Sequence, residues 1–175
     1  MQKVAGILFI SIFTIAVLSF SKADKEKINW VSVTEMNELY SKNPKPILLD
    51  VYTDWCGWCK VMDRETYSND NVADYLNKNF YAVKFNAEST GTIEFGTKKY
   101  NYNASYRAND LAISLLNGRL AYPTTVFLPA IDAQPSPLAG YLKPADLEAP
   151  VKYFGEGAYK NKDYPSYMKE FTVSW

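Results

Sequence analysis

Residues 47–60 read Ile47-Leu-Leu-Asp-Val-Tyr-Thr-Asp-Trp-Cys-Gly-Trp-Cys-Lys60 and contain both cysteines of the 175-residue chain. The first half of this stretch, Ile47 to Thr53, is apolar enough to predict a central strand buried on both faces. A helix is expected to follow, from Gly57 to about Tyr67. Two thiols spaced like Cys56 and Cys59, where a strand gives way to a helix, can open and close a disulfide with little backbone movement. The stretch therefore predicts redox-active cysteines.

Other roles for the two cysteines are less consistent with the sequence. A permanent disulfide between them would close a loop too short to remove much chain entropy. A zinc site would need further ligands, and the chain has no second CxxC and no histidine. Haem attachment requires a histidine after the second cysteine, where Lys60 stands. We therefore expect neither a metal nor a cofactor.

The composition excludes further classes of function. Because the chain has no histidine, it has no Cys–His protease site and no histidine general base. Nineteen basic residues balance 19 acidic ones, so no overall field steers the protein toward nucleic acid.

The first 23 residues have the pattern of a secretory signal peptide. Lys3 precedes a nearly continuous apolar run from Val4 to Phe20, and Ser21-Lys22-Ala23 places small residues where a signal peptidase reads them. We expect cleavage after Ala23, which would leave the mature protein in the periplasm or outside the cell. The alternative is an uncleaved anchor formed by the same apolar run, with the domain outside the cytoplasm. In either case a dithiol would stay reduced only with an electron donor.

The rest of the chain alternates expected strands and helices. Ser32 and Glu35 have capping-box spacing at the start of a helix that Pro44 ends. Pro144 should start the last main helix, which Pro150 is expected to kink or divide. The other expected elements are strands at 28–33, 80–85 and 124–128, an edge strand at 135–141, a helix at 70–78 capped by Asp70, and helices at 109–116 and 164–172. Between them, 92–95 and 98–102 flank Gly96-Thr97 and predict a β-hairpin.

Two motifs in this order resemble the thioredoxin superfamily. Residues 47–60 resemble its active-site strand and helix start, and Tyr122-Pro123-Thr124-Thr125-Val126-Phe127 resembles its cis-proline strand. The likeness covers about 28–154 and is nearest to exported thioredoxin-like proteins with Trp before the second cysteine. It implies an α/β fold of three layers, with a mixed central sheet flanked by helices, in a single domain over 24–175. The hairpin near 92–102 and a helical extension over 155–175 depart from a minimal thioredoxin.

The resemblance assigns catalytic roles to four residues. Cys56 would lie at a helix N-terminus, where backbone amides stabilise a thiolate, and act as the attacking nucleophile. Cys59, one turn deeper, would resolve the mixed disulfide by attacking Cys56. Asp50 matches the family's buried acid, whose raised pKa would let it relay a proton to or from Cys59, and Lys84 matches the lysine beside that acid. The simpler alternatives are an ordinary ion pair of Asp50 with Lys84, or two unrelated residues at strand ends.

The resemblance also implies a substrate-binding surface around the thiols. A cis Pro123 would turn the Tyr122 backbone toward Cys56, where an extended peptide could pair with it; the alternative is a trans proline that opens a strand. Trp55 and Trp58 could form an apolar platform or serve packing, and we expect them to combine both roles. The expected substrate-contacting residues are Trp55, Gly57, Trp58, Tyr122, Pro123 and Thr124.

Together these features predict an exported thiol–disulfide oxidoreductase that reduces or isomerises protein disulfides. The direction rests on family analogy, because no residue encodes the reduction potential. We expect a monomer that binds no nucleic acid and receives electrons from a membrane or periplasmic thiol donor. The alternatives are a non-enzymatic binding module for a peptide or glycan, and a dedicated disulfide-forming oxidant.

Overall fold

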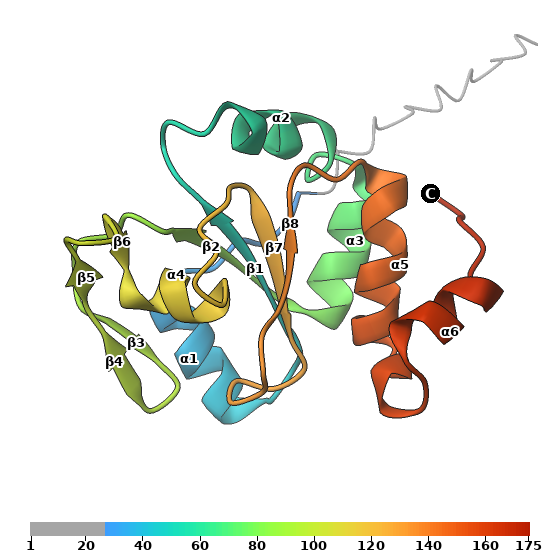
Figure 1. Cartoon of the computed structure of the whole chain (residues 1–175). Helices are drawn as coiled ribbons and strands as arrows, with labels where there is room; N and C mark the ends of the chain where they lie inside the picture. Colours follow the sequence, from blue (N-terminus) through green and yellow to red (C-terminus); the bar gives the residue numbers. More distant parts are fainter. Residues whose placement is uncertain (1–26) are drawn as a thin grey trace, which may run out of the picture.

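The computed structural model describes residues 27–175, and a four-stranded mixed sheet lies at its centre (Figure 1). The strand order is β2-β1-β7-β8. β1 runs parallel to β2 and antiparallel to β7, and β7 is antiparallel to β8. The strands are β1 (Ile47–Tyr52), β2 (Tyr81–Asn86), β7 (Thr124–Leu128) and β8 (Ser136–Ala139). The apolar run before the cysteines therefore forms an inner strand, as predicted.

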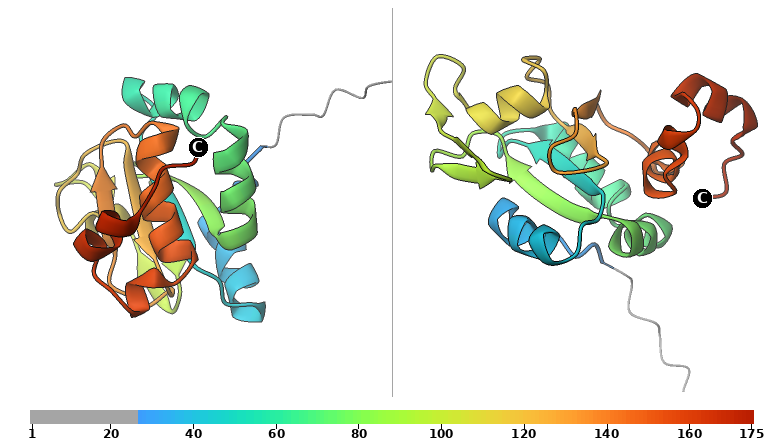
Figure 2. Two further views of the ribbon diagram at one scale, coloured as in Figure 1. Left: turned by 90° about the vertical axis from the view of Figure 1, so that its right-hand side faces the viewer. Right: turned by 90° about the horizontal axis from the view of Figure 1, so that it is seen from below.

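Helices cover both faces of this sheet and give the fold three layers (Figure 2). On one face, α1 (Val33–Lys42) and α4 (Asp110–Leu115) pack against alternate strand residues such as Leu49, Val83 and Val126. This alternation follows from the two-residue period of a strand. The expected α/β architecture with a mixed sheet between helices is confirmed.

The opposite face holds a second core, to which three helices contribute. α3 (Asp70–Asn79) and α5 (Pro144–Gly155) pack against Leu48 and Phe127, and α2 (Gly57–Glu65) adds Met62 to the same cluster. α2 follows β1 directly, so burial of Met62 fixes the helix that carries the cysteines against the sheet.

Helix starts follow from local side-chain chemistry. The Ser32 hydroxyl accepts a hydrogen bond from the Glu35 amide and caps α1, as predicted. α3 is capped by Asn69, whose side chain accepts from the amides of Asn71 and Val72, so the prediction that Asp70 caps it is wrong by one residue. Asp70 lies instead in the first turn, where its charge complements the helix dipole.

The insertion between β2 and α4 forms two small antiparallel ladders. β3 (Ile93–Phe95) pairs with β4 (Lys98–Tyr100), which confirms the hairpin, and Gly96 takes the positive φ of its turn. The side-chain amide of Asn37 in α1 donates to the backbone carbonyl of Glu94 and accepts from the backbone amide of Gly96. These two hydrogen bonds fix the hairpin to the core. β5 (Tyr102–Asn103) pairs with β6 (Ala108–Asn109), a ladder that the sequence did not predict.

One element prediction is wrong, and a second is wrong in part. Residues 28–33 form no strand in the described chain; a single parallel bridge joins Val31 to Val83, because α1 already begins at Val33. Pro150 does not divide the last main helix, since α5 continues through it. Leu147 and Val151 on either side are both fully buried, and their packing holds the helix together across the missing amide.

The C-terminal extension folds back against α5. It contains a short 3-10 helix (Ala158–Lys160) and α6 (Tyr164–Glu170), and the Tyr153 hydroxyl of α5 donates to the Lys162 carbonyl between them. The predicted signal peptide and the alternative anchor lie outside the described residues. Within residues 27–175, no helix combines the length and hydrophobicity needed to cross a bilayer.

Candidate active site

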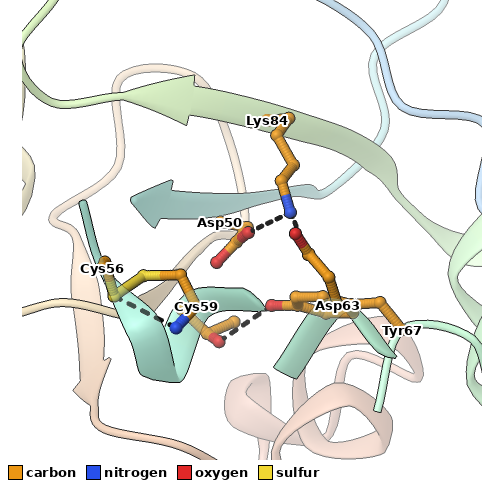
Figure 3. A network of polar contacts seen from close by, with 7 residues as sticks. Asp50, Cys56, Cys59, Asp63, Tyr67 and Lys84 are labelled. Carbon is orange, nitrogen blue, oxygen red and sulfur yellow. Dashed lines mark hydrogen bonds and ion pairs between the residues drawn. A yellow bond between two sulfur atoms is a disulfide. The ribbon is translucent and has the colours of Figure 1, made fainter. Parts of the chain in front are cut away.

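The two cysteines form a disulfide at the start of α2 (Figure 3). Cys56 is the N-cap, and its Sγ accepts a hydrogen bond of 3.1 Å from the Cys59 amide. An N-cap sulfur lies at the positive end of the helix dipole and next to unpaired amides, which favours a thiolate once the disulfide opens. Cys59 lies inside the first helical turn. The two residues are only 4% and 3% exposed.

Asp50 lies between this disulfide and Lys84 (Figure 3). It is 1% exposed, at a β1 position paired with Lys84 of β2 and Thr125 of β7. The Lys84 Nζ is 2.8 Å from Asp50 Oδ2. Within the described part of the chain, Oδ1 has no hydrogen-bond partner. Burial raises the pKa of Asp50, and the positive charge of Lys84 offsets this only in part.

Lys84 forms ion pairs with two carboxylates. One is Asp50, and the other is Asp63 of α2, whose side chain is partly exposed. Burial opposes protonation of Lys84, but the charges of Asp50 and Asp63 outweigh it and raise the lysine pKa. The Nζ further lies 5.1–5.5 Å from the ring centroids of Trp30, Tyr52 and Tyr67. The lysine is therefore held as a cation beside the buried acid.

The sequence analysis missed Asp63 and Tyr67 in this network. The Tyr67 hydroxyl is 3.2 Å from Thr125 Oγ1, and burial raises the pKa of this tyrosine. A signal for both residues exists. Cys59, Asp63 and Tyr67 follow one another at intervals of four, which would place them along one side of the helix expected from Gly57 to about Tyr67.

Asp63, Tyr67 and Lys84 also line a pocket of about 430 Å³ together with Lys27, Ile28, Trp30 and Ser68. The pocket gives the Lys84–Asp63 pair an opening to solvent.

Three of the expected substrate-contacting residues, Trp55, Gly57 and Trp58, flank the two cysteines in the sequence. Trp55 and Trp58 are 67% and 62% exposed, the most exposed large hydrophobic residues of the described chain. The Trp55 indole donates to Glu88, a residue that the sequence analysis also missed, and its ring packs edge-on against Tyr122. Trp55 therefore combines a largely exposed surface with a packing contact.

The cis-proline loop supplies the remaining members of the set. The Tyr122–Pro123 peptide bond is cis, as the resemblance implies. Thr124 is buried and its hydroxyl donates to the Ala121 carbonyl, so its side chain is engaged within its own loop. Gly57 is the first residue of α2, and a Cβ there would meet no atom within 4 Å.

Among the described residues, no group of three or more His, Cys, Asp or Glu side chains could hold a metal ion.

A family model described as "Thioredox_DsbH: Protein of unknown function, DUF255" matches residues 18–153. The chain belongs to the thioredoxin-like DsbH/DUF255 family. This match covers the disulfide, the buried acid and the cis-proline loop. The chain is thus a DsbH/DUF255 protein with a thioredoxin-like oxidoreductase fold and an active-site cysteine pair.

A curated relative of this DsbH/DUF255 chain is the thiol:disulfide interchange protein DsbD of Pectobacterium atrosepticum. The two are 34% identical over 47 residues, which is 27% of this chain and 8% of that protein. The chain thus spans less than a tenth of that relative's length.

Solved structures give the same fold. A structure titled "DsbH Oxidoreductase" matches with a TM-score of 0.51 at 15% identity, covering 85% of this chain and 95% of that one. A thioredoxin-fold protein from Helicobacter pylori matches with a TM-score of 0.57 at 17% identity and 85% coverage of both chains. At this level of identity the likeness concerns the fold alone.

Proposed function

We propose that the chain is an exported thiol–disulfide oxidoreductase that reduces or isomerises the disulfides of other proteins. The observation that carries the proposal is the Cys56–Cys59 disulfide at the N-terminus of α2, with buried Asp50 between it and Lys84. A helix start favours a thiolate at Cys56, and a buried carboxyl with a raised pKa can accept a proton near neutral pH. The name of the DsbD relative supports the same exchange chemistry.

In the reducing direction the protein begins as the dithiol. The Cys56 thiolate attacks one sulfur of the substrate disulfide, forms a mixed disulfide and expels one substrate thiolate, which takes a proton from water. Cys59 then loses its proton, and its thiolate attacks Cys56 Sγ and expels the second substrate thiolate. The substrate gains two electrons, and the protein is left with the Cys56–Cys59 disulfide seen in the structure.

Asp50 is the proposed acceptor of the Cys59 proton. Cys59 is buried, so its proton needs an acceptor close by, and a bridging water can connect it to Asp50. Asp50→Asn keeps the shape but removes the base. It should slow the second step about 100-fold at neutral pH while leaving formation of the mixed disulfide nearly unchanged. Rapid mixing with a disulfide peptide separates the two steps, and an unchanged second step would contradict this role.

The compartment and the donor belong to the same proposal. The leader pattern of residues 1–23 supports export to the periplasm, where the oxidised protein must be returned to the dithiol. A membrane or periplasmic thiol protein would supply the two electrons, and the domain would act as a monomer.

Disulfide reduction in vitro tests the function directly. Purified protein should accelerate insulin reduction by dithiothreitol, and Cys56→Ser should abolish the effect. Cys59→Ser should accumulate mixed disulfides with substrates because the resolving thiol is missing. Partner binding that survives Cys56→Ser, without any reductase activity in the wild type, would identify a binding module instead.

The direction of transfer is tested by equilibrating the protein with glutathione. A reductase or isomerase should have a reduction potential at or below that of the compartment. A potential well above it would identify a dedicated oxidant and overturn the proposed direction.

A further inference from the structure

A pair of aromatic side chains outside the cis-proline motif forms one side of the site. Trp58 lies in the first turn of α2, between Gly57 and Cys59, and is 62% exposed. Its ring centroid is 5.6 Å from that of Tyr141, with the planes tilted by 33°. Tyr141 comes from the segment between β8 and α5, far from α2 in the sequence. The fold therefore brings a second ring to the edge of the disulfide.

Three contacts fix the segment that carries Tyr141. Its hydroxyl donates to Glu65 Oε2 at 2.8 Å. The Gly140 amide donates to the carbonyl of Pro123 at 2.8 Å, and the Thr66 hydroxyl donates to the carbonyl of Leu142. The ring is thus tied to the cis-proline loop on one side and to the end of α2 on the other, so little conformational entropy remains to be lost on binding.

Two of the charges beside this ring pair, those of Arg64 and Glu65, are paired with each other, and Lys143 adds a further positive charge near Glu65. Glu65 Oε1 lies 2.8 Å from the Arg64 guanidinium, and Oε2 accepts from Tyr141. Both carboxylate oxygens are therefore used, and the Arg64 and Glu65 charges cancel. The hydrogen bonds from Arg64 and Tyr141 lower the pKa of Glu65, which keeps it ionised and unfavourable for an acidic ligand. The exposed surface of the two rings is aromatic, and the neighbouring Arg64 and Glu65 charges are paired, which suits an apolar side chain.

We propose that Tyr141 is a specificity-determining residue, held in position by Glu65, and that Tyr141 and Trp58 bind a large apolar side chain next to the reacting cysteine of a polypeptide substrate. This assignment depends on the function proposed above. Trp55 and Tyr122, whose rings pack against each other, are the other aromatic residues of the proposed substrate surface. Trp58 and Tyr141 would add a second aromatic wall to this surface.

Binding of short peptides tests the wall without the redox chemistry. Two matched peptides carry serine in place of the reacting cysteine and have either Phe or Gly on both sides of it. By calorimetry, the oxidised wild type should bind the Phe peptide about tenfold more tightly, as expected when aromatic surface is partly buried. Tyr141→Ala should reduce this preference to less than about twofold.

Conservative variants distinguish the contribution of the Tyr141 ring from that of the hydrogen bond to Glu65 that holds it in position. Tyr141→Phe keeps the ring and loses the hydroxyl, and Glu65→Gln weakens the acceptor, so both should retain about a threefold preference. Tyr102→Ala removes an exposed tyrosine of the insertion and should leave the preference unchanged. A wild type that binds both peptides equally, or a full preference in Tyr141→Ala, would overturn the inference.

A small disulfide distinguishes failure of the inference from failure of the proposed function. Hydroxyethyl disulfide carries no large apolar side chain for the ring pair to bind, so its reduction by the dithiol form reports the exchange chemistry alone. If the wild type prefers the Phe peptide but does not reduce this compound, the wall stands and the proposed function fails. If it reduces the compound but Tyr141→Ala keeps the peptide preference, the proposed function stands and the wall fails.

Discussion

Asp50 is held where its ionised form is disfavoured. It is buried on an inner strand, one carboxylate oxygen has a lysine partner, and the other has no partner within the described residues. Its pKa therefore lies above the ordinary value of 3.8. The folded protein consequently binds this proton more tightly than the unfolded chain does, which links the acid to the stability of the protein.

The sign of this linkage can be measured. A raised pKa contributes stability that is present at low pH and is lost as the pH rises from about 4 through the folded-state pKa. Oxidised wild type should therefore lose stability relative to Asp50→Asn over this range. Urea unfolding of both proteins at several pH values gives the difference. A difference that stays constant with pH would contradict the raised pKa.

Lys84 should matter most through Asp50. Lys84→Met removes the cation beside a buried carboxylate and should lower the free energy of unfolding by about 3 kcal/mol at pH 7. The double variant with Asp50→Asn leaves no buried charge unpaired. Its free energy of unfolding should therefore fall by much less than the sum of the decreases in the two single variants. A double-mutant cycle by urea unfolding measures the coupling, and additive losses would show that the pair is not coupled.

Single residues differ in how far the sequence predicts them. Cys56, Cys59 and Pro123 stand in motifs, and Asp50 is conspicuous as a charge within an apolar strand. Glu88 and Tyr141 have no such sequence signal, because only the tertiary fold brings them to the site. Asp63 lies between these cases, since its helical spacing from Cys59 was readable although its partner Lys84 lies on another element.

Among the elements, α5 shows how close the helix contacts are. At its end, Gly155 faces α3, and a Cβ built there would lie 2.8 Å from the Tyr75 hydroxyl and 3.0 Å from a ring carbon of Phe80. Real Cβ atoms do not approach other atoms so closely. The missing side chain therefore allows α5 and α3 to approach each other.

Gly155→Ala should lower the free energy of unfolding by about 1–3 kcal/mol, because Tyr75 and Phe80 must move to admit the methyl group. Gly91→Ala is the matched control, since a Cβ there meets nothing within 4 Å, and it should change stability by less than about 0.5 kcal/mol. Thermal or urea unfolding compares the two. Equal effects would show that the contact at α5 is easily relaxed.

The sequence predicts most elements because their caps and periodicity are local. The hairpin around Gly96 and the helix after Asn109 are examples. The ladder between Tyr102 and Asn109 was missed because two-residue strands have no readable period. Pro150 does not divide α5 because burial of its neighbours outweighs the local preference of proline, and such burial is a property of the tertiary structure.

For the molecule as a whole, a buried carboxylate on α5 holds the C-terminal segment. Glu148 is fully buried and accepts hydrogen bonds from the amides of Ser174 and Trp175, from the Ser174 hydroxyl and from Lys152. Burial alone would raise its pKa, but these donors outweigh burial and lower the pKa to about 2. The Trp175 ring also packs against Tyr75 of α3.

A depressed pKa contributes stability that is present above pH 4.5 and is lost as the pH falls toward 2. Glu148→Gln should remove this pH dependence and lower the free energy of unfolding by about 3 kcal/mol at pH 7. Acid titration of stability in both proteins provides the measurement. A wild-type slope that persists in Glu148→Gln would assign it to other carboxylates.

The sheet order also has a kinetic consequence. Cys56 and Cys59 are three positions apart, so they meet even in an unstructured chain. Asp50 gains Lys84 and Thr125 as neighbours only when β2 and β7 have joined β1 from distant parts of the sequence, and closing such long loops is slow. A newly made or denatured copy therefore carries two thiols that lack the buried acid and its partners. Their selectivity is acquired only when the polypeptide has finished folding.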